Sequence, residues 1–250
     1  MQVVNTKAIV ISSIKYRDTS LIVKLYTKEV GLVSYLLKGI LKSKKGRLKS
    51  AYFLPLTQLK IIANHHEKRS LQNLKDAQVN FVYKSIHTSL PKQSIVLFLS
   101  EVLGNAIKEQ ENNIALYDYL ENSLIWFDSH QDISNFHLVF LLNLTKFLGF
   151  YPDLSQSTKS GFHLQEGVFS NDHTNKNIIS GNELMLLKRL LGTNFDGSNY
   201  GVFTKKVGTL TNDYFKNLLD MNITWSDKDD KEQYFQGKNR KTNKVIWEGS

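Results

Sequence analysis

The chain has 250 residues, of which 41% are hydrophobic, and it carries a formal net charge of +9. This length and composition are typical of a globular protein with one large or two ordinary domains, and they exclude a disordered chain. The absence of cysteine excludes disulfides and cysteine-ligated metal and fits a reducing cytosol, and apolar runs such as residues 94–99 are far too short to span a membrane.

The first 80 residues contain five short segments with the pattern of β-strands. Residues 4–15 are rich in β-branched side chains, residues 21–27 alternate between two faces, and Gly31 supplies the permissive backbone of a turn. The predicted strands are residues 4–15, 21–27, 32–40, 57–66 and 71–79. Five strands interrupted by one long basic loop predict a small closed β-barrel, for which an OB-fold is the natural candidate.

Helical periodicity replaces this pattern after residue 80. Pro91 suits the first turn of a helix, and residues 133–150 are apolar nearly all round, as expected for a buried central helix. Residues 153–180 are polar and rich in Gly, Ser and Asn, which predicts a long loop or a small lobe. The predicted helices are residues 92–109, 113–127, 133–150, 181–192 and 209–221.

These elements predict an α+β fold, in which an N-terminal OB-fold β-barrel is followed by a helical domain. We expect residues 1–80 to form the barrel and a nucleic-acid-binding domain, and residues 81–225 to form the helical domain. Residues 226–250 are mostly charged and polar, so we expect a loose tail.

The positive charge is concentrated in the first third of the chain. Residues 1–75 contain 15 Lys and Arg against three acids, a net charge of +12, whereas the other residues carry a net charge of −3. Such asymmetry indicates a polyanion-binding module, and a run of cations without an acid is typical of contacts to a phosphate backbone. Six cations lie in the predicted loop after the third strand: Lys38, Lys42, Lys44, Lys45, Arg47 and Lys49.

Other residues of the barrel could extend this surface. A groove for single strands also needs flat groups on which bases stack. Tyr26, Tyr35 and Tyr52 are possible platforms, of which we select Tyr26 and Tyr35 as candidates, although the barrel core competes for each of them. Phe53 is assigned to the core. The cations expected to extend the surface are Arg17, Lys24 and Lys60, followed by Lys68 and Arg69.

The sequence offers no motif of a familiar enzyme. It lacks a phosphate-binding G-x-x-x-x-G-K-[ST] loop, a G-x-S-x-G elbow and an H-E-x-x-H helix. The acidic cluster 128–132 is interpreted as a turn between helices, and the adjacent His65 and His66 of a strand would point to opposite faces and share no metal. We therefore expect a binding protein without catalytic residues or cofactors.

The order of these features resembles that of the RecO family of bacterial recombination mediators. The resemblance is carried by "GLVSYLLKGILKSKKGRLKSAYFLPL" and "LKDAQ" within residues 31–78 and by "LGFYPDL" at residues 148–154. It implies a cytoplasmic, nucleoid-associated protein that binds single- and double-stranded DNA and anneals complementary strands. It also implies joint action with RecR in replacing single-stranded DNA-binding protein (SSB) by RecA.

The resemblance further implies a docking site for the acidic C-terminal tail of SSB on the helical domain. Such a site would need an apolar pocket rimmed by a cation, which Lys146, Lys188 or Arg189 could supply, and the sequence does not choose among them.

Two features depart from the family pattern. Many members carry a zinc-binding cysteine cluster after the "GF-P" anchor, whereas residues 153–180 contain only His163 and His173, which we interpret as surface histidines without a metal. The C-terminal 25 residues also do not align with the family's usual helical end, so the resemblance implies no function for them.

Two other interpretations remain open at this point. An OB-fold protein that binds RNA would have the same charge pattern, since only contacts to the 2′-hydroxyl distinguish RNA from DNA. A pure interaction protein whose basic face meets an acidic protein would bind nucleic acid weakly and without saturation.

Overall fold

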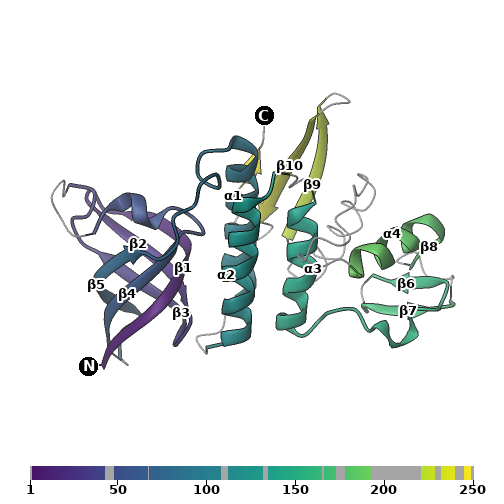
Figure 1. Cartoon of the computed structure of the whole chain (residues 1–250), viewed down its shortest axis with the longest axis horizontal. Helices are drawn as coiled ribbons and strands as arrows, with labels where there is room; N and C mark the ends of the chain where they lie inside the picture. Colours follow the sequence, from purple (N-terminus) through teal and green to yellow (C-terminus); the bar gives the residue numbers. More distant parts are fainter. Residues whose placement is uncertain are drawn as a thin grey trace. The chain divides into compact units, whose positions relative to one another are not determined.

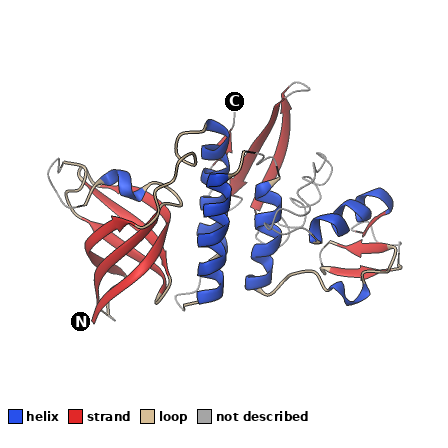
Figure 2. Ribbon diagram, viewed as in Figure 1, coloured by secondary structure: helices blue, strands red, loops and turns tan. Residues whose placement is uncertain are grey.

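The computed structural model describes residues 2–42, 48–66, 68–107, 112–131, 135–164, 166–172, 178–192, 221–228, 232–239 and 245–248. The chain divides into two compact units, residues 1–129 and residues 130–250. Among these residues, the first unit contains the barrel and two α-helices, and the second contains two more α-helices and two small sheets (Figures 1 and 2). The fold is therefore a mixed α+β fold, as predicted.

Five strands close into a barrel at the N-terminus (Figure 1). The order around the barrel is β1-β2-β3-β5-β4, and β3 pairs with β5 in parallel while the other neighbours are antiparallel. This small five-stranded barrel confirms the predicted OB-like fold. The strands are β1 (Gln2–Tyr16), β2 (Ser20–Thr27), β3 (Gly31–Leu37), β4 (Gln58–His65) and β5 (Leu71–Val79).

The alternation of side chains along β2 separates the barrel core from the outer face. Leu21, Val23 and Leu25 are buried in the core, while Lys24 between them is exposed. Because Val23 pairs with Tyr35 of β3, the Tyr35 ring also points into the barrel. A short 3₁₀ helix, η1 (Ser50–Phe53), buries Phe53 against this core, as predicted.

Two helices complete the first unit, α1 (Leu90–Ala106) and α2 (Ile114–Ser129). Pro91 lies in the first turn of α1, as its fixed φ favours. The Ser100 hydroxyl of α1 donates to the carbonyl oxygen of Ile11 in β1 at 2.6 Å, and Gln58 of β4 donates from its amide to the carbonyl oxygen of Glu121 in α2 at 3.0 Å. Both helices therefore pack against the outside of the barrel.

Asp128 fixes the segment between β5 and α1 to the end of α2. Its carboxylate accepts hydrogen bonds from the backbone N–H groups of Lys84, Ser85 and Ile86 at 2.9, 2.8 and 3.0 Å. The buried Lys92 ammonium donates to the carbonyl oxygen of Asp128 at 2.9 Å. Burial by itself would raise the pKa of Asp128, but the backbone donors outweigh it and hold that pKa below its usual value.

The interpretation of residues 128–132 as an inter-helix turn is therefore wrong for Asp128. This residue lies in the last turn of α2, where its carboxylate organises the segment that connects β5 to α1.

The second unit is built on α3 (Phe136–Leu148), which is buried along most of its length, as predicted. It ends at Gly149, whose φ of 81° is a left-handed conformation that glycine adopts without strain. A small lobe follows and shares an apolar core with α3. Its elements are η2 (Leu154–Gln156), β6 (Gly161–His163), β7 (Val168–Ser170), β8 (Ile178–Ser180) and α4 (Gly181–Leu191).

The lobe corrects one expectation about histidines. His163 is buried in β6 with 7% of its surface exposed, so it is not a surface histidine. Its Nδ1 accepts from the backbone N–H of Glu166 at 3.3 Å. His173 lies outside the described residues.

The C-terminal segment differs from the expected loose tail. Its backbone forms an antiparallel sheet in the order β11-β10-β9, from β9 (Met221–Lys228), β10 (Glu232–Asn239) and β11 (Val245–Glu248). The predicted helix 209–221 lies outside the described residues except for Met221, which begins β9. The first compact unit also extends to residue 129, whereas the sequence predicts a boundary at residue 80.

Candidate nucleic-acid interface

The basic loop leaves the barrel beside the turn between β1 and β2. The Leu41 N–H donates to the carbonyl oxygen of Thr19 at 3.0 Å, and the Gly39 N–H donates to the Ser20 hydroxyl at 3.3 Å. Gly39 has a φ of 69°, which permits the sharp departure from β3. The Lys38, Lys42 and Lys49 side chains are exposed. The remaining predicted cations of the loop lie outside the described residues: Lys44, Lys45 and Arg47.

The turn between β1 and β2 adds a cation and an aromatic ring to this end of the barrel. Arg17 is exposed, and its guanidinium carbon lies 5.2 Å from the centre of the Tyr16 ring. Tyr16 is itself 37% exposed, so its ring is open to solvent. Sequence reasoning missed Tyr16, and its position at the end of a strand beside Arg17 was the available signal.

The two tyrosines selected as stacking platforms are both buried, so that prediction is wrong. Tyr26 lies on the outer face of β2, but α2 covers it: its hydroxyl donates to the carbonyl oxygen of Asn113 at 3.2 Å, and its ring packs near that of Tyr117. Tyr35 lies inside the barrel, where burial raises the pKa of its hydroxyl. Its oxygen lies 2.8 Å from His65 Nε2.

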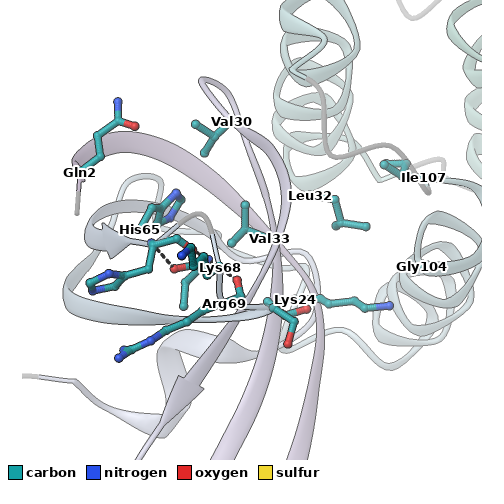
Figure 3. A pocket seen from close by; sticks show the side chains of 14 residues that line it. Gln2, Lys24, Val30, Leu32, Val33, His65, Lys68, Arg69, Gly104 and Ile107 are labelled. Atoms are coloured by element: carbon teal, nitrogen blue, oxygen red, sulfur yellow. Dashed lines mark hydrogen bonds between the residues drawn. The ribbon is translucent and has the colours of Figure 1, made fainter.

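A second basic region surrounds an open pocket of about 940 Å³ beside β2 and β3 (Figure 3). Lys24 of β2 reaches it from one side, and Lys68 and Arg69 of the β4–β5 turn reach it from another. Apolar side chains line it together with these cations. They include Val30, Leu32, Val33 and Ile107.

The charged side chains that line this pocket among the described residues are all cations. Lys24, Lys68 and Arg69 are exposed, and no carboxylate of the described residues forms an ion pair with them. The described ion pairs of the first unit are instead Lys7–Glu121 and Lys28–Asp118, at α2. Burial lowers the pKa of His65, so this pocket-lining ring is neutral at pH 7.

One predicted cation lies elsewhere on the barrel. Lys60 is exposed on β4, where its neighbours are Lys7 of β1 and Gln78 of β5. In the closed strand order, β4 is separated from β2 by β1 and from β3 by β5. The structure therefore brings Lys24, Lys68 and Arg69 together but leaves Lys60 out of that group.

The cations considered for the SSB tail lie on the second unit. Lys146 of α3 donates to Asn143 Oδ1 at 2.6 Å and lies 4.7 Å from the centre of the Tyr151 ring. Lys188 of α4 donates to the carbonyl oxygen of Lys159 at 3.1 Å, while Arg189 is exposed. These contacts do not single out one docking cation.

The described part of the chain contains no group of three histidine, aspartate, glutamate or cysteine side chains arranged to hold a metal ion. No helix among the described residues is long and apolar enough to cross a membrane.

A five-stranded OB-like barrel with basic loops, followed by helices, places this chain among the OB-fold proteins. The family model described as "Recombination protein O N terminal" matches residues 1–83, and "Recombination protein O C terminal" matches residues 87–226. The chain therefore belongs to the RecO family.

Curated relatives agree with this assignment. The DNA repair protein RecO of Christiangramia forsetii is 46% identical over 86% of this chain and 89% of its own length. The DNA repair protein RecO of Flavobacterium johnsoniae is 47% identical over 78% of this chain and 82% of its own length. A more distant relative, the DNA repair protein RecO of Bacteroides fragilis, is 41% identical over 60% of this chain and 62% of its own length.

The zinc cluster found in many RecO proteins does not fit the residues present here. The chain has no cysteine, and the His163 ring of the lobe is buried and bonded to the backbone of Glu166. The lobe is instead held by an apolar core in which the Phe162 and Phe169 rings meet edge to face, 5.0 Å apart.

Proposed function

We propose that this chain is a DNA repair mediator that binds single- and double-stranded DNA through its barrel and anneals complementary strands. With RecR it would help to replace SSB by RecA on single-stranded DNA, in the cytoplasm and close to the nucleoid. In this proposal the chain acts by binding and uses no catalytic residue or cofactor. The observation that carries the proposal is the placement of a basic loop at the start of β2 and a basic pocket further along the same strand.

Strand β2 links the two basic regions. The loop and Arg17 lie next to Ser20, where β2 begins, and Lys24 of the pocket lies four residues further along the same strand. At about 3.3 Å per residue, this separation is roughly 13 Å. A nucleic-acid backbone that follows β2 would therefore meet cations at both ends of a short path.

The chemistry of these groups favours phosphates as the ligand. Lysine and arginine side chains that replace condensed counterions gain free energy without reading base sequence. Screening the charge of one strand also lowers its repulsion of a complementary strand, which is the physical requirement for annealing.

Docking of the SSB tail belongs to the second unit in this proposal. An acidic peptide would need a cation beside an apolar surface, and Lys146, Lys188 and Arg189 each remain open for that role.

The test is a fluorescence-anisotropy titration of a labelled single-stranded DNA across a salt series, with an RNA of equal sequence alongside. Six loop contacts would give a log–log salt slope of about −4, and three further contacts at the pocket would steepen it to about −6. Saturable DNA binding at least as strong as RNA binding is expected, followed by accelerated annealing of complementary strands.

The other results point to other functions. A clear preference for RNA would support an RNA-binding protein. No saturable binding to either nucleic acid would overturn the proposal and direct attention to an acidic protein partner.

A further inference from the structure

The turn that carries Lys68 and Arg69 is held by one side-chain amide. Gln72 Oε1 accepts from the backbone N–H of His66 at 2.8 Å, and its Nε2 donates to the carbonyl oxygens of His66 and Arg69 at 3.0 and 2.6 Å. The Arg69 N–H closes the turn by donating to the His66 carbonyl oxygen at 3.0 Å. The amide of Gln72 therefore forms hydrogen bonds with three main-chain groups of the turn.

Gln72 also lies where the barrel closes. The pairing of β3 with β5 consists of two residue pairs, Ser34 with Leu71 and Tyr35 with Gln72. The hydrogen bond between Tyr35 and His65 lies at the same junction. The turn therefore ends where β5 pairs with β3, the shortest strand pairing of the barrel, and the side-chain hydrogen bonds add to these few backbone contacts.

The basic side chains themselves do not fix this turn. Lys68 and Arg69 are exposed, and long cationic side chains have many rotamers, so the direction in which they project depends on the main chain below them. The main-chain groups bonded by Gln72 lie on either side of Lys68, at His66 and Arg69.

We propose that Gln72 is a positioning residue for nucleic-acid binding, because its amide holds the turn in the shape that directs Lys68 and Arg69 into the pocket. The inference rests on the proposed function and extends it to a residue that touches no phosphate. Without the amide, both cations would remain, but the His66 N–H and the Arg69 carbonyl oxygen would turn to water. The turn would then be closed only by the bond from the Arg69 N–H to the His66 carbonyl oxygen, and the spacing of the cations would be less firmly fixed. Ordering them on binding would then cost affinity.

The first measurement tests the positioning without any ligand. In Gln72→Met, a variant of similar size, we expect amide hydrogen exchange at His66 to accelerate by about fivefold or more, the factor that corresponds to one ordinary hydrogen bond. The matched control is Gln78→Met, which replaces an exposed glutamine on the same strand and should leave exchange at His66 unchanged. Circular dichroism of both variants reports whether the barrel is folded.

The second measurement is the affinity for single-stranded DNA at 0.1 M salt. At this salt concentration, loss of one phosphate contact lowers the affinity about fivefold and loss of two lowers it about 25-fold. Gln72→Met should therefore lower the affinity by between about fivefold and 25-fold and make the log–log salt slope about 0.7 to 1.4 less steep. Gln78→Met should bind like the unsubstituted chain. In a Lys68→Ala/Arg69→Ala background, adding Gln72→Met should change affinity by less than about twofold, because the groups that it positions are absent.

The outcomes separate the two proposals. Equal losses from Gln72→Met with and without Lys68 and Arg69 would show a general structural role and overturn the inference. So would unchanged affinity or unchanged exchange at His66 in a chain that binds DNA. If the unsubstituted chain does not bind DNA, the proposed function fails and the inference fails with it. If Gln72→Met does not fold, Gln72→Glu compared with Gln78→Glu repeats the affinity measurement at equal charge, because a carboxylate cannot donate to the carbonyl oxygens of His66 and Arg69.

Discussion

Removing the three cations of the pocket should produce a defined loss of affinity for single-stranded DNA. In the variant Lys24→Ala/Lys68→Ala/Arg69→Ala, three contacts at about 0.7 each should make the log–log salt slope about 2 less steep. The same relation gives an affinity loss of about 100-fold at 0.1 M salt. When the salt concentration rises from 50 to 200 mM, the affinity of the unsubstituted chain should fall by a factor about 20 times larger than the factor for the variant. All three side chains are exposed, so the fold should be unaffected.

The assay is the anisotropy titration at four or more salt concentrations. Its matched control is Lys60→Ala/Lys75→Ala/Lys84→Ala, which removes three exposed cations of the same unit that do not line the pocket. Net charge falls equally in both variants, so long-range attraction falls similarly, and the difference between their slopes isolates local contact. If the two variants lose the same affinity and show the same slope, the assignment of the pocket as a phosphate-binding site is wrong.

Three further predictions address the loop and the stability of each unit. The first variant replaces four loop cations by alanine: Lys42, Lys44, Lys45 and Arg47. The log–log salt slope should become about 2.8 less steep for every DNA sequence alike, and the melting temperature should not fall. Unchanged DNA affinity would contradict the loop assignment. Asp128→Asn should lower the free energy of unfolding, measured by urea denaturation, by about 2 kcal/mol, because its carboxylate accepts three backbone hydrogen bonds. Asp118→Asn, in the partly exposed pair with Lys28, should lower it much less. Burial of His137 lowers its pKa to about 3 from 6.5, so the neutral ring is favoured in the folded state and stability falls as pH drops below 6.5. Between pH 7 and pH 5, this residue should lower the free energy of unfolding by about 2 kcal/mol. This pH-dependent loss should be absent in His137→Leu. A His137 ring that titrates near pH 6.5 by NMR would contradict the prediction.

The fold was predictable because its signals are local. Alternation along residues 21–27 and apolar periodicity in residues 133–150 reflect burial of one face or of a whole helix, and both elements form where expected. The extra strands at the C-terminus were missed because that segment is dominated by charged and polar residues, which do not show the alternation of a half-buried strand.

The sequence predicts cations of the candidate nucleic-acid interface, but it does not predict which aromatic rings are exposed there. Charge density locates the loop and flags Lys68 and Arg69 without any structural knowledge. The burial of Tyr26 depends on a helix about 90 residues later, which covers a ring that alternation places on the outer face of β2. The burial of Tyr35 depends on the register that pairs it with Val23. Neither partner can be read from the residues around each tyrosine.

The burial of these two tyrosines bears on how the barrel would treat a DNA strand. A surface that stacks bases on aromatic rings holds the bases themselves, and a base held in this way is not free to pair. Here Tyr26 and Tyr35 are buried, whereas the exposed cations Lys24, Lys68 and Arg69 lie at the pocket beside β2 together with apolar side chains. Contacts of this kind grip phosphates and leave the base edges open to a complementary strand, while the cations screen the repulsion between the two backbones. An interface that acts on phosphates therefore suits annealing better than storage of a single strand.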